Sequence, residues 1–496
     1  MKRLLVLFLA LLLLCGCAPA SGPTQTAAPT TETAAPPQPE PTAATPSETA
    51  VLENARLSDL TADTVLLYRQ AEFKSRQGTL FSMDTVRSAS EEALLPRSHE
   101  YDDCFPGDSA LWLQLLDYAF ANEYQGFSVR TRSLPALSED QRSAIDILYR
   151  IDDGRMCFLD TDGVTTAFYL CNRTDAMEKF AVGLQEARRI ASEAPRGDDW
   201  ETTEWIFRYL ADHLTYGDRE TYYSDRGHHL YDALVENECL CSGYADAMYY
   251  LCSLCGVECL ELQGFSNGPA GPGSEEVDGH AWNIARVYGT WYVCDPTFND
   301  TAPMPAEVPP LCFCLSSRFM EATFGHRADW IYADANWIPA CETCFDPVSA
   351  WNATPEGALK SWLWFAAYDA FDPAYLLACG GLADYRAEAA VSDESERIDT
   401  DISYEAYAAW AGRFMAEDAA ALLPWVFAEG GDGKLTVRRA ETDTGIDWGK
   451  LAIRSVSAGE DGVYTADLGS ADAVFTVTEN ADGLYRIETI TLTAKP

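Results

Sequence analysis

The sequence predicts an α+β protein in which a helix beginning at Cys241 packs on an antiparallel sheet, with smaller α+β domains flanking this core. The chain has 496 residues, which at roughly 100–200 residues per domain corresponds to about two to four domains. It is 47% hydrophobic and 12% aromatic, which is enough to build buried cores and excludes wholesale disorder. Helical spacing of apolar residues in the middle of the chain gives way after His280 to the alternation typical of strands.

The first residues have the pattern of an export signal. Met1-Lys2-Arg3 is positively charged, and Leu4–Leu14 is apolar but too short to span a membrane. The segment ends at Cys15-Gly16-Cys17, which resembles the lipobox of bacterial lipoproteins. That resemblance implies that residues 1–17 are a lipoprotein signal peptide and that Cys17 is lipidated, which anchors the protein to the outer face of the bacterial cell membrane. An ordinary secretory signal, cleaved a little further on, is the alternative.

Residues 18–50 consist almost entirely of Ala, Pro, Thr, Ser, Glu and Gln. Such a segment has no apolar face to bury, so we expect a disordered tether between the anchor and the folded part. The formal net charge is −42, from 77 acidic and 35 basic residues. This charge repels phosphates and anionic lipid heads, so we expect no nucleic-acid partner and no membrane contact beyond the lipid anchor.

Three folded regions are predicted: an N-terminal α+β domain over 51–173, a central domain over 174–345 and a C-terminal α+β module over 346–496. In the first, helical spacing covers 110–122, and strands are predicted at 126–132, 145–151 and 165–170. In the last, helices are predicted near 355–368 and 404–422, followed by a strand meander at 462–468, 473–478 and 484–492.

Cys241 is the first candidate for chemistry. Residues 242–255 favour a helix that ends at Gly256, so Cys241 lies at or just before its N-terminus. The unpaired N–H groups and the dipole there stabilise an anion, which lowers the pKa of a thiol. The small Ser242 leaves room for a substrate carbonyl, and the Cys241 N–H is a candidate donor to the oxyanion.

His280 and Asp295 lie on two segments that read as a hairpin. His280 opens an alternating run, Tyr288-Gly289 makes a turn, and a second strand ends at Asp295 before a proline. If the loop has two residues, the pleat places His280 and Asp295 on one face of the sheet as diagonal neighbours. Asp295 would then accept a hydrogen bond from one imidazole nitrogen and leave the other facing Cys241.

Three segments together resemble the transglutaminase-like family, which is related to papain-like cysteine proteases. They are Cys241-Ser242-Gly243-Tyr244-Ala245, Gly279-His280-Ala281-Trp282-Asn283 and Trp291-Tyr292-Val293-Cys294-Asp295-Pro296-Thr297. The resemblance covers about 200–335 and implies Cys241 as nucleophile, His280 as general base and acid, and Asp295 as the orienting carboxylate.

Flanking residues extend the resemblance. Leu214-Thr215-Tyr216 is similar to an upstream family element, which makes Tyr216 a candidate for lining the site or the oxyanion hole. Phe313–Ser317 is similar to the closing strand. Trp282 is either core packing or a surface over the substrate cleft. Ser242 departs from the glutamine of many bacterial members, which puts the substrate preference in doubt.

The remaining cysteines give no comparable pattern. The chain has 16 in all, and Cys252-x-x-Cys255 and Cys341-x-x-Cys344 have metal-ligand spacing. The first pair falls inside the helix after Cys241, so we expect no metal site, and the choice between disulfides and free thiols stays open. No nucleotide, flavin or haem motif occurs, so we expect no cofactor.

The sequence therefore predicts an enzyme that transfers acyl groups from amide bonds through a thioester. Water as acceptor would make it a peptidase or amidase, and an amine would make it a transglutaminase. We expect a peptide, a protein or a cell-wall amide as substrate. The alternative is a non-catalytic transglutaminase-like module that binds a wall polymer or a protein partner.

Overall fold

The computed structural model describes residues 52–495 except for short gaps, which are 70–71, 73–74, 76, 100, 150–154, 161–164, 172–175, 219–220, 222–226, 268–277, 300–308, 329–337, 384, 386–396 and 441–445. The predicted signal peptide with Cys17 and the predicted tether over 18–50 lie outside the described residues. The chain forms two compact units. Among the described residues, one unit comprises those of 52–94, Gln114–Ala136 and Cys157–Tyr169, and the other comprises those of Leu95–Leu113, Leu137–Met156 and 170–495.

The first unit is built around a sheet of six strands in the order β1-β3-β2-β4-β6-β5. Their bounds are β1 (Leu52–Arg56), β2 (Thr64–Tyr68), β3 (Gln77–Ser82), β4 (Gly126–Arg130), β5 (Arg155–Asp160) and β6 (Thr165–Cys171). Phe127 and Phe168 stack across β4 and β6 with ring centroids 5.2 Å apart, and both are fully buried. The helices nearby in sequence are α3 (Met83–Arg87) and α4 (Ala110–Ala121), the second as predicted.

The predicted strand at 145–151 is wrong, because this segment ends a helix, α5 (Glu139–Leu148). Ser138 caps the helix by accepting a hydrogen bond from the Gln141 N–H, while the Gln141 side chain accepts one from the Ser138 N–H. Ile145 and Leu148 are buried at a helical spacing of three. The β-branched and aromatic residues of the segment suggested a strand, and the capping box four residues upstream overrides that preference.

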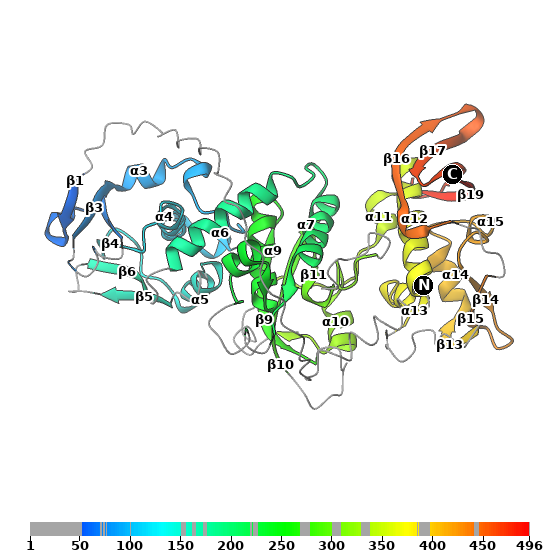
Figure 1. Cartoon of the computed structure of the whole chain (residues 1–496), viewed down its shortest axis with the longest axis horizontal. Helices are drawn as coiled ribbons and strands as arrows, with labels where there is room; N and C mark the ends of the chain where they lie inside the picture. The colour runs from blue at the N-terminus through cyan, green and yellow to red at the C-terminus, as the bar shows by residue number, and fades with distance from the viewer. Residues whose placement is uncertain are drawn as a thin grey trace, which may run out of the picture. The chain divides into compact units, whose positions relative to one another are not determined.

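The transglutaminase-like region of the second unit packs helices on an antiparallel sheet, as predicted (Figure 1). Its helices are α6 (Ala176–Ala191), α7 (Asp199–His213) and α9 (Cys241–Cys255), and its sheet has the order β11-β10-β9-β12. The strands are β9 (Cys259–Ser266), β10 (Asp278–Val287), β11 (Thr290–Cys294) and β12 (Arg327–Ala328). Helix α9 is buried from Ser242 to Cys252 and packs against β9 and β10, so this helix is the centre of the core.

The hairpin between β10 and β11 has the predicted register. Val287 pairs with Thr290, and the two loop residues Tyr288 and Gly289 have φ angles of 49° and 81°. Positive φ at both positions is the geometry of a type I′ turn, which follows the natural twist of a hairpin. The two-residue loop fixes the parity of the pairing and brings His280 and Asp295 together.

The predicted closing strand over Phe313–Ser317 is wrong in extent. Cys312 and Cys314 have left-handed backbones with φ angles of 53° and 55°, which break the alternation of a strand. Only Leu315 pairs with the sheet, through a single bridge to Val293. Ser316 then caps the next helix, α10 (Ser317–Phe324). A short parallel pair, β7 (Thr215–Tyr216) and β8 (Glu238–Cys239), leads into α9.

The C-terminal part of the second unit combines helices with two antiparallel sheets. The helices are α11 (Pro347–Trp351), α12 (Pro355–Phe371), α13 (Pro373–Cys379), α14 (Tyr404–Ala411) and α15 (Glu417–Ala420). One sheet has the order β13-β15-β14, from β13 (Arg397–Ser403), β14 (Trp425–Glu429) and β15 (Lys434–Arg439). The other is the predicted meander, β16 (Leu451–Ala458), β17 (Val463–Gly469), β18 (Ala471–Glu479) and β19 (Tyr485–Ala494).

The predicted helix at 404–422 is two short helices, because α14 ends at Ala411, with Gly412 as its C-cap, and α15 starts at Glu417. Within the described part of the chain, no helix has both the length and the apolar character needed to cross a membrane.

Candidate active site

Cys241 is the first residue of α9 and lies at the point where the helix meets the surface. It is partly exposed, whereas the next eleven residues are buried. The preceding Leu240 has extended backbone, donates its N–H to the Gly227 carbonyl, and provides no side-chain cap. The N–H groups of the first turn are therefore left without a side-chain acceptor from the N-cap, and they favour negative charge at this end of the helix.

His280 and Asp295 form a buried hydrogen bond between the two strands of the hairpin. The His280 Nε2 lies 2.7 Å from the Asp295 Oδ2, and the two side chains are 7% and 0% exposed. The other carboxylate oxygen, Oδ1, accepts a hydrogen bond from the Thr297 N–H at 3.1 Å. Because Nε2 is engaged with Asp295, Nδ1 is the imidazole nitrogen left for Cys241.

The thiol of Cys241 is held in an environment that favours the thiolate. Burial raises its pKa, but the hydrogen bond to His280, the charge of that imidazole and a hydrogen bond with the Ala281 backbone outweigh burial and bring the pKa below the ordinary value. Burial lowers the pKa of His280, yet the Asp295 carboxylate raises it to about 10. These opposite shifts favour a thiolate beside an imidazolium over a neutral pair.

Two aromatic rings fix the orientation of the His280 imidazole. Trp282 stacks on it with centroids 5.9 Å apart and an angle of 21°, and Phe298 meets it edge-on at 5.1 Å. Trp282 is 4% exposed, so it is part of the packed wall behind the imidazole. The structure thus brings Trp282 into contact with the predicted triad.

Ser242 and Tyr216 lie near the start of α9 but make different contacts. The Ser242 hydroxyl lies 3.0 Å from the Nδ1 of His228, and Ser242 is 7% exposed. Tyr216 pairs through its backbone with Cys239, two residues before Cys241, and is 42% exposed. Neither contact involves His280 or Asp295.

A second histidine at this site was not predicted. The Nε2 of His326 lies 2.7 Å from the same Asp295 Oδ2 that binds His280, and its side chain is 2% exposed. His326 follows Gly325, which ends α10, and precedes the short strand β12. It is one of six histidines, and no local pattern marks it, since its partner lies 31 residues earlier in the chain.

His280, Asp295 and His326 are also a candidate metal-binding group, with ligand atoms within 4.8 Å of one another. Ligands of a tetrahedral zinc ion, at about 2.0–2.1 Å from the metal, lie roughly 3.3 Å apart. Both nitrogens lie 2.7 Å from the oxygen, a hydrogen-bond distance that is too short for two ligands of one such ion. We therefore interpret the cluster as a hydrogen-bonded one. Cys252, Cys255, Cys341 and Cys344 are free thiols.

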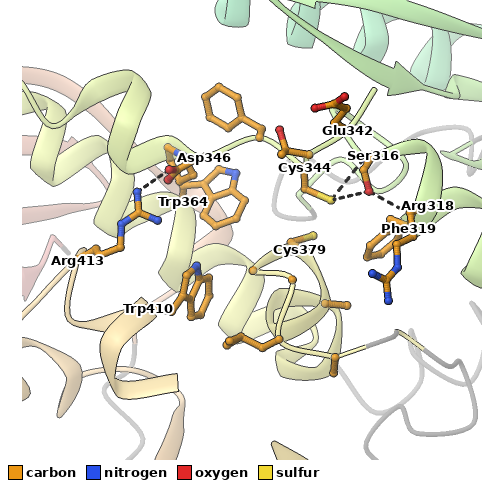
Figure 2. A pocket seen from close by; sticks show the side chains of 18 of the residues that line it. Ser316, Arg318, Phe319, Glu342, Cys344, Asp346, Trp364, Cys379, Trp410 and Arg413 are labelled. Atoms are coloured by element: carbon orange, nitrogen blue, oxygen red, sulfur yellow. Dashed lines mark hydrogen bonds and ion pairs between the residues drawn. The ribbon is translucent and has the colours of Figure 1, made fainter. Parts of the chain in front are cut away.

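A separate pocket of about 520 Å³ lies beside α10, α12 and α13 (Figure 2). Its walls include Trp364 and Trp410, together with the ion pair between Arg413 and Asp346. None of the residues that line it belongs to the cluster of Cys241 and its partners. The pocket is thus a hollow of its own, and we do not assign the chemistry of Cys241 to it.

A thiol at a helix start, facing an imidazole that is bound to a buried carboxylate, is the arrangement of cysteine-dependent enzymes with papain-like and transglutaminase-like folds. Residues 187–296 match the family model of the Transglutaminase-like superfamily, so the chain contains a transglutaminase-like domain, as the sequence motifs predicted. The match supports a general thiol-dependent function.

Individual relatives were also found. The chain is 29% identical over 105 residues to the Kyphoscoliosis peptidase of Homo sapiens and 28% identical over 105 residues to that of Mus musculus. Each alignment covers 20% of this chain and 16% of the relative, so the chain spans about a sixth of the length of the curated relatives that it matches.

Two solved structures are similar at 12% identity. One is a TGase, with a TM-score of 0.21 over 33% of this chain and 48% of the other. The second is a cysteine protease candidate from Cytophaga hutchinsonii, with a TM-score of 0.19 over 29% of this chain and 62% of the other.

Proposed function

We propose that this protein catalyses acyl transfer from an amide carbonyl through a thioester on Cys241. The observation that carries the proposal is the position of Cys241 at the start of α9 beside His280, whose imidazole is hydrogen-bonded at 2.7 Å to the buried Asp295. Each of the three residues supplies what the reaction needs: a thiolate to attack the carbonyl, an imidazolium to protonate the leaving amine, and a carboxylate to hold the imidazole in place.

In the first half of the reaction, the Cys241 thiolate attacks the amide carbon and the carbonyl oxygen becomes an oxyanion. The free N–H groups at the start of α9, including that of Cys241, are the proposed donors to this oxyanion. The imidazolium of His280 gives its proton to the nitrogen of the leaving amine, so that the C–N bond breaks and a thioester remains. Tyr216 and Ser242 are proposed to border the substrate, since they flank the helix start.

In the second half, neutral His280 takes a proton from water or from an amine, which attacks the thioester and releases Cys241 as a thiolate. We favour water, and hence hydrolysis of a peptide, protein or cell-wall amide, because we also propose that the protein is a lipoprotein on the outer face of the bacterial membrane. Lipidation of Cys17 would be visible as palmitate labelling that a Cys17→Ala variant loses.

The test of the proposed chemistry is alkylation of Cys241 by iodoacetamide as a function of pH, read by peptide mass spectrometry. We expect fast labelling with an apparent pKa well below the ~8.5 of a free cysteine, and loss of that behaviour in His280→Ala. His213→Ala is a matched control, because His213 lies at the end of α7 and bonds to the Tyr209 carbonyl.

Slow labelling of Cys241 that is the same in wild type and His280→Ala would contradict the proposal. The non-catalytic binding module would then be the better description of the domain. A positive result would justify a screen of peptide and wall-amide substrates with and without an added primary amine, which separates hydrolysis from cross-linking.

A further inference from the structure

We infer that His326 is a positioning residue of this site, a neutral imidazole that holds the Asp295 carboxylate in the orientation in which it binds His280. This inference rests on the proposed function, because it assigns a role within the same group of residues. It adds a fourth member to the three that the sequence motifs identify.

The geometry gives Asp295 three donors from three separate segments. Oδ2 accepts from His280 on β10 and from His326 before β12, both at 2.7 Å, and Oδ1 accepts from the Thr297 backbone at 3.1 Å. A carboxylate bound on both oxygens cannot turn about its Cβ–Cγ bond without breaking a hydrogen bond. Loss of His326 leaves Oδ2 with His280 as its one remaining donor of these two, so the carboxylate is held by two hydrogen bonds instead of three and its orientation is less tightly fixed.

His326 is closed off from solvent by aromatic rings. Trp282, Phe298 and Phe324 lie with ring centroids 5.1, 5.1 and 6.1 Å from it, and His326 is 6% exposed. The titratable groups that face it are Asp295 and His280. Because the His326 side chain is this deeply buried, a positive charge on its imidazole would be poorly solvated.

The charge state follows from these surroundings. Burial lowers the pKa of His326, the Asp295 carboxylate opposes this, the His280 charge adds to it, and the net direction is down. Its Nδ1 is buried and has no hydrogen-bond partner among the described residues. A neutral imidazole with its proton on Nε2 satisfies this arrangement, because the bare Nδ1 needs no acceptor, whereas an imidazolium would bury an unpaired N–H donor.

His280 and His326 thus bind the same carboxylate oxygen of Asp295 but have different roles. His280 carries the charge that stabilises the Cys241 thiolate, while His326 contributes a neutral hydrogen bond that fixes the acceptor. The competing interpretation is that His326 merely satisfies a buried carboxylate and contributes stability alone. The two interpretations differ in whether the pH profile of Cys241 depends on His326.

The experiment is the pH profile of Cys241 alkylation in the full chain, compared among wild type, His326→Leu and His326→Gln. We expect His326→Leu to lower the rate at pH 6.5 by about tenfold or more and to move the profile to higher pH, because a hydrogen bond to a buried charge is lost. The glutamine amide is a donor of similar reach, so His326→Gln should stay within about threefold of wild type.

Met320→Ala is the control for general destabilisation, since Met320 is fully buried in α10 and outside the cluster. It should leave the profile unchanged. A wild-type profile in folded His326→Leu would overturn the inference, while the loss seen in His280→Ala would still support the proposed function.

If His326→Leu does not fold, the wild-type protein still tests the neutral charge state that the inference requires. Its imidazole nitrogens can be labelled with ¹⁵N and followed by NMR from pH 5.5 to 8.5. We expect one neutral Nε2–H tautomer throughout, assigned to His326 by its loss in His326→Gln. An imidazolium at pH 7, or the Nδ1–H tautomer, would overturn the inference.

Discussion

Cys241 and Cys312 both lie near the Asp295 carboxylate, but the pKa of the Cys241 thiol is lowered and that of the Cys312 thiol is raised. Burial raises the pKa of Cys312 well above its usual value, and the charge of Asp295 raises it further. The same carboxylate also acts to raise the pKa of Cys241, which nevertheless falls because His280 lies against its thiol. Nearness to the carboxylate therefore activates neither thiol, and the interaction with the His280 imidazole is what lowers the pKa of Cys241.

Cys314 sharpens this comparison, because it is another buried thiol of the same segment. Burial raises the pKa of the Cys314 thiol, and a hydrogen bond with the free thiol of Cys294 raises it further. Such thiols behave as small apolar side chains. The domain thus holds cysteines of two kinds, and among those compared, Cys241 at the start of α9 combines a helix end with an imidazole.

The largest expected effect is the difference in labelling between these two kinds. In a short pulse of iodoacetamide at pH 6.5, Cys241 should react at least about a thousandfold faster than Cys312 or Cys314, because exposing a buried core thiol requires costly local unfolding. Peptide mass spectrometry measures this, and urea should make the three cysteines equal. Rapid labelling of Cys312 in the native protein would break the comparison.

Replacing the shared carboxylate should have the next largest effect. In Asp295→Asn the pKa of His280 falls, and we expect the loss of the imidazolium beside Cys241 to outweigh the loss of the carboxylate's own repulsion, so that the pKa of Cys241 rises. Alkylation at pH 6.5 should then slow by about tenfold for each pKa unit that Cys241 gains. Asp346→Asn is the control, since this carboxylate pairs with Arg413. Equal rates for the two variants would mean that Asp295 does not support His280.

The thiolate–imidazolium pair also predicts that the stability of Cys241→Ala depends on pH in a range where this pair gives the wild-type protein no pH dependence. Between about pH 6.5 and 8.5 the folded pair holds one proton, on His280, and the unfolded chain holds one, on Cys241, so the pair contributes no slope. In Cys241→Ala, His280 alone remains, with a folded pKa raised above its unfolded value by Asp295. Its stabilisation is complete below the unfolded pKa and is lost as pH rises through the folded pKa.

Urea unfolding of wild type and Cys241→Ala at pH 6.5, 7.5 and 8.5 measures this difference. We expect the variant to lose up to about 1.4 kcal/mol per pH unit relative to wild type. Parallel profiles for the two proteins would show that Cys241 is protonated in the folded state.

The smallest expected effect is at Cys294, the buried partner of Cys314. Cys294→Ala should cost about 1 kcal/mol of unfolding free energy, as for a small core truncation, and leave the alkylation profile of Cys241 unchanged. A shift in that profile would mean that the buried thiols influence the nucleophile, contrary to the comparison.

The sequence predicts the local parts of this site well and the distant part poorly. The helix start at Cys241 and the two-residue turn at Tyr288-Gly289 are set by neighbouring residues. The position of the thiol at the helix N-terminus and the pairing register of the hairpin can therefore be derived from the residue spacing alone. His326 reaches Asp295 only through the path of α10 and β12, and no short-range pattern encodes that path. The left-handed backbones at Cys312 and Cys314 were missed because neither is a glycine or an asparagine.

The segment after Asp295 has a consequence for dividing the protein into fragments. The Asp295 N–H donates to the Cys312 carbonyl, and the Cys312 N–H donates to the hydroxyl of Tyr375 on α13. The Tyr368 hydroxyl on α12 donates to the Pro310 carbonyl nearby. A fragment cut where the family match ends at residue 296, or even at 345, would lack both tyrosines that anchor this segment. The smallest fragment expected to keep the carboxylate in place therefore extends through α13, and gene fusions or domain grafts should respect that boundary.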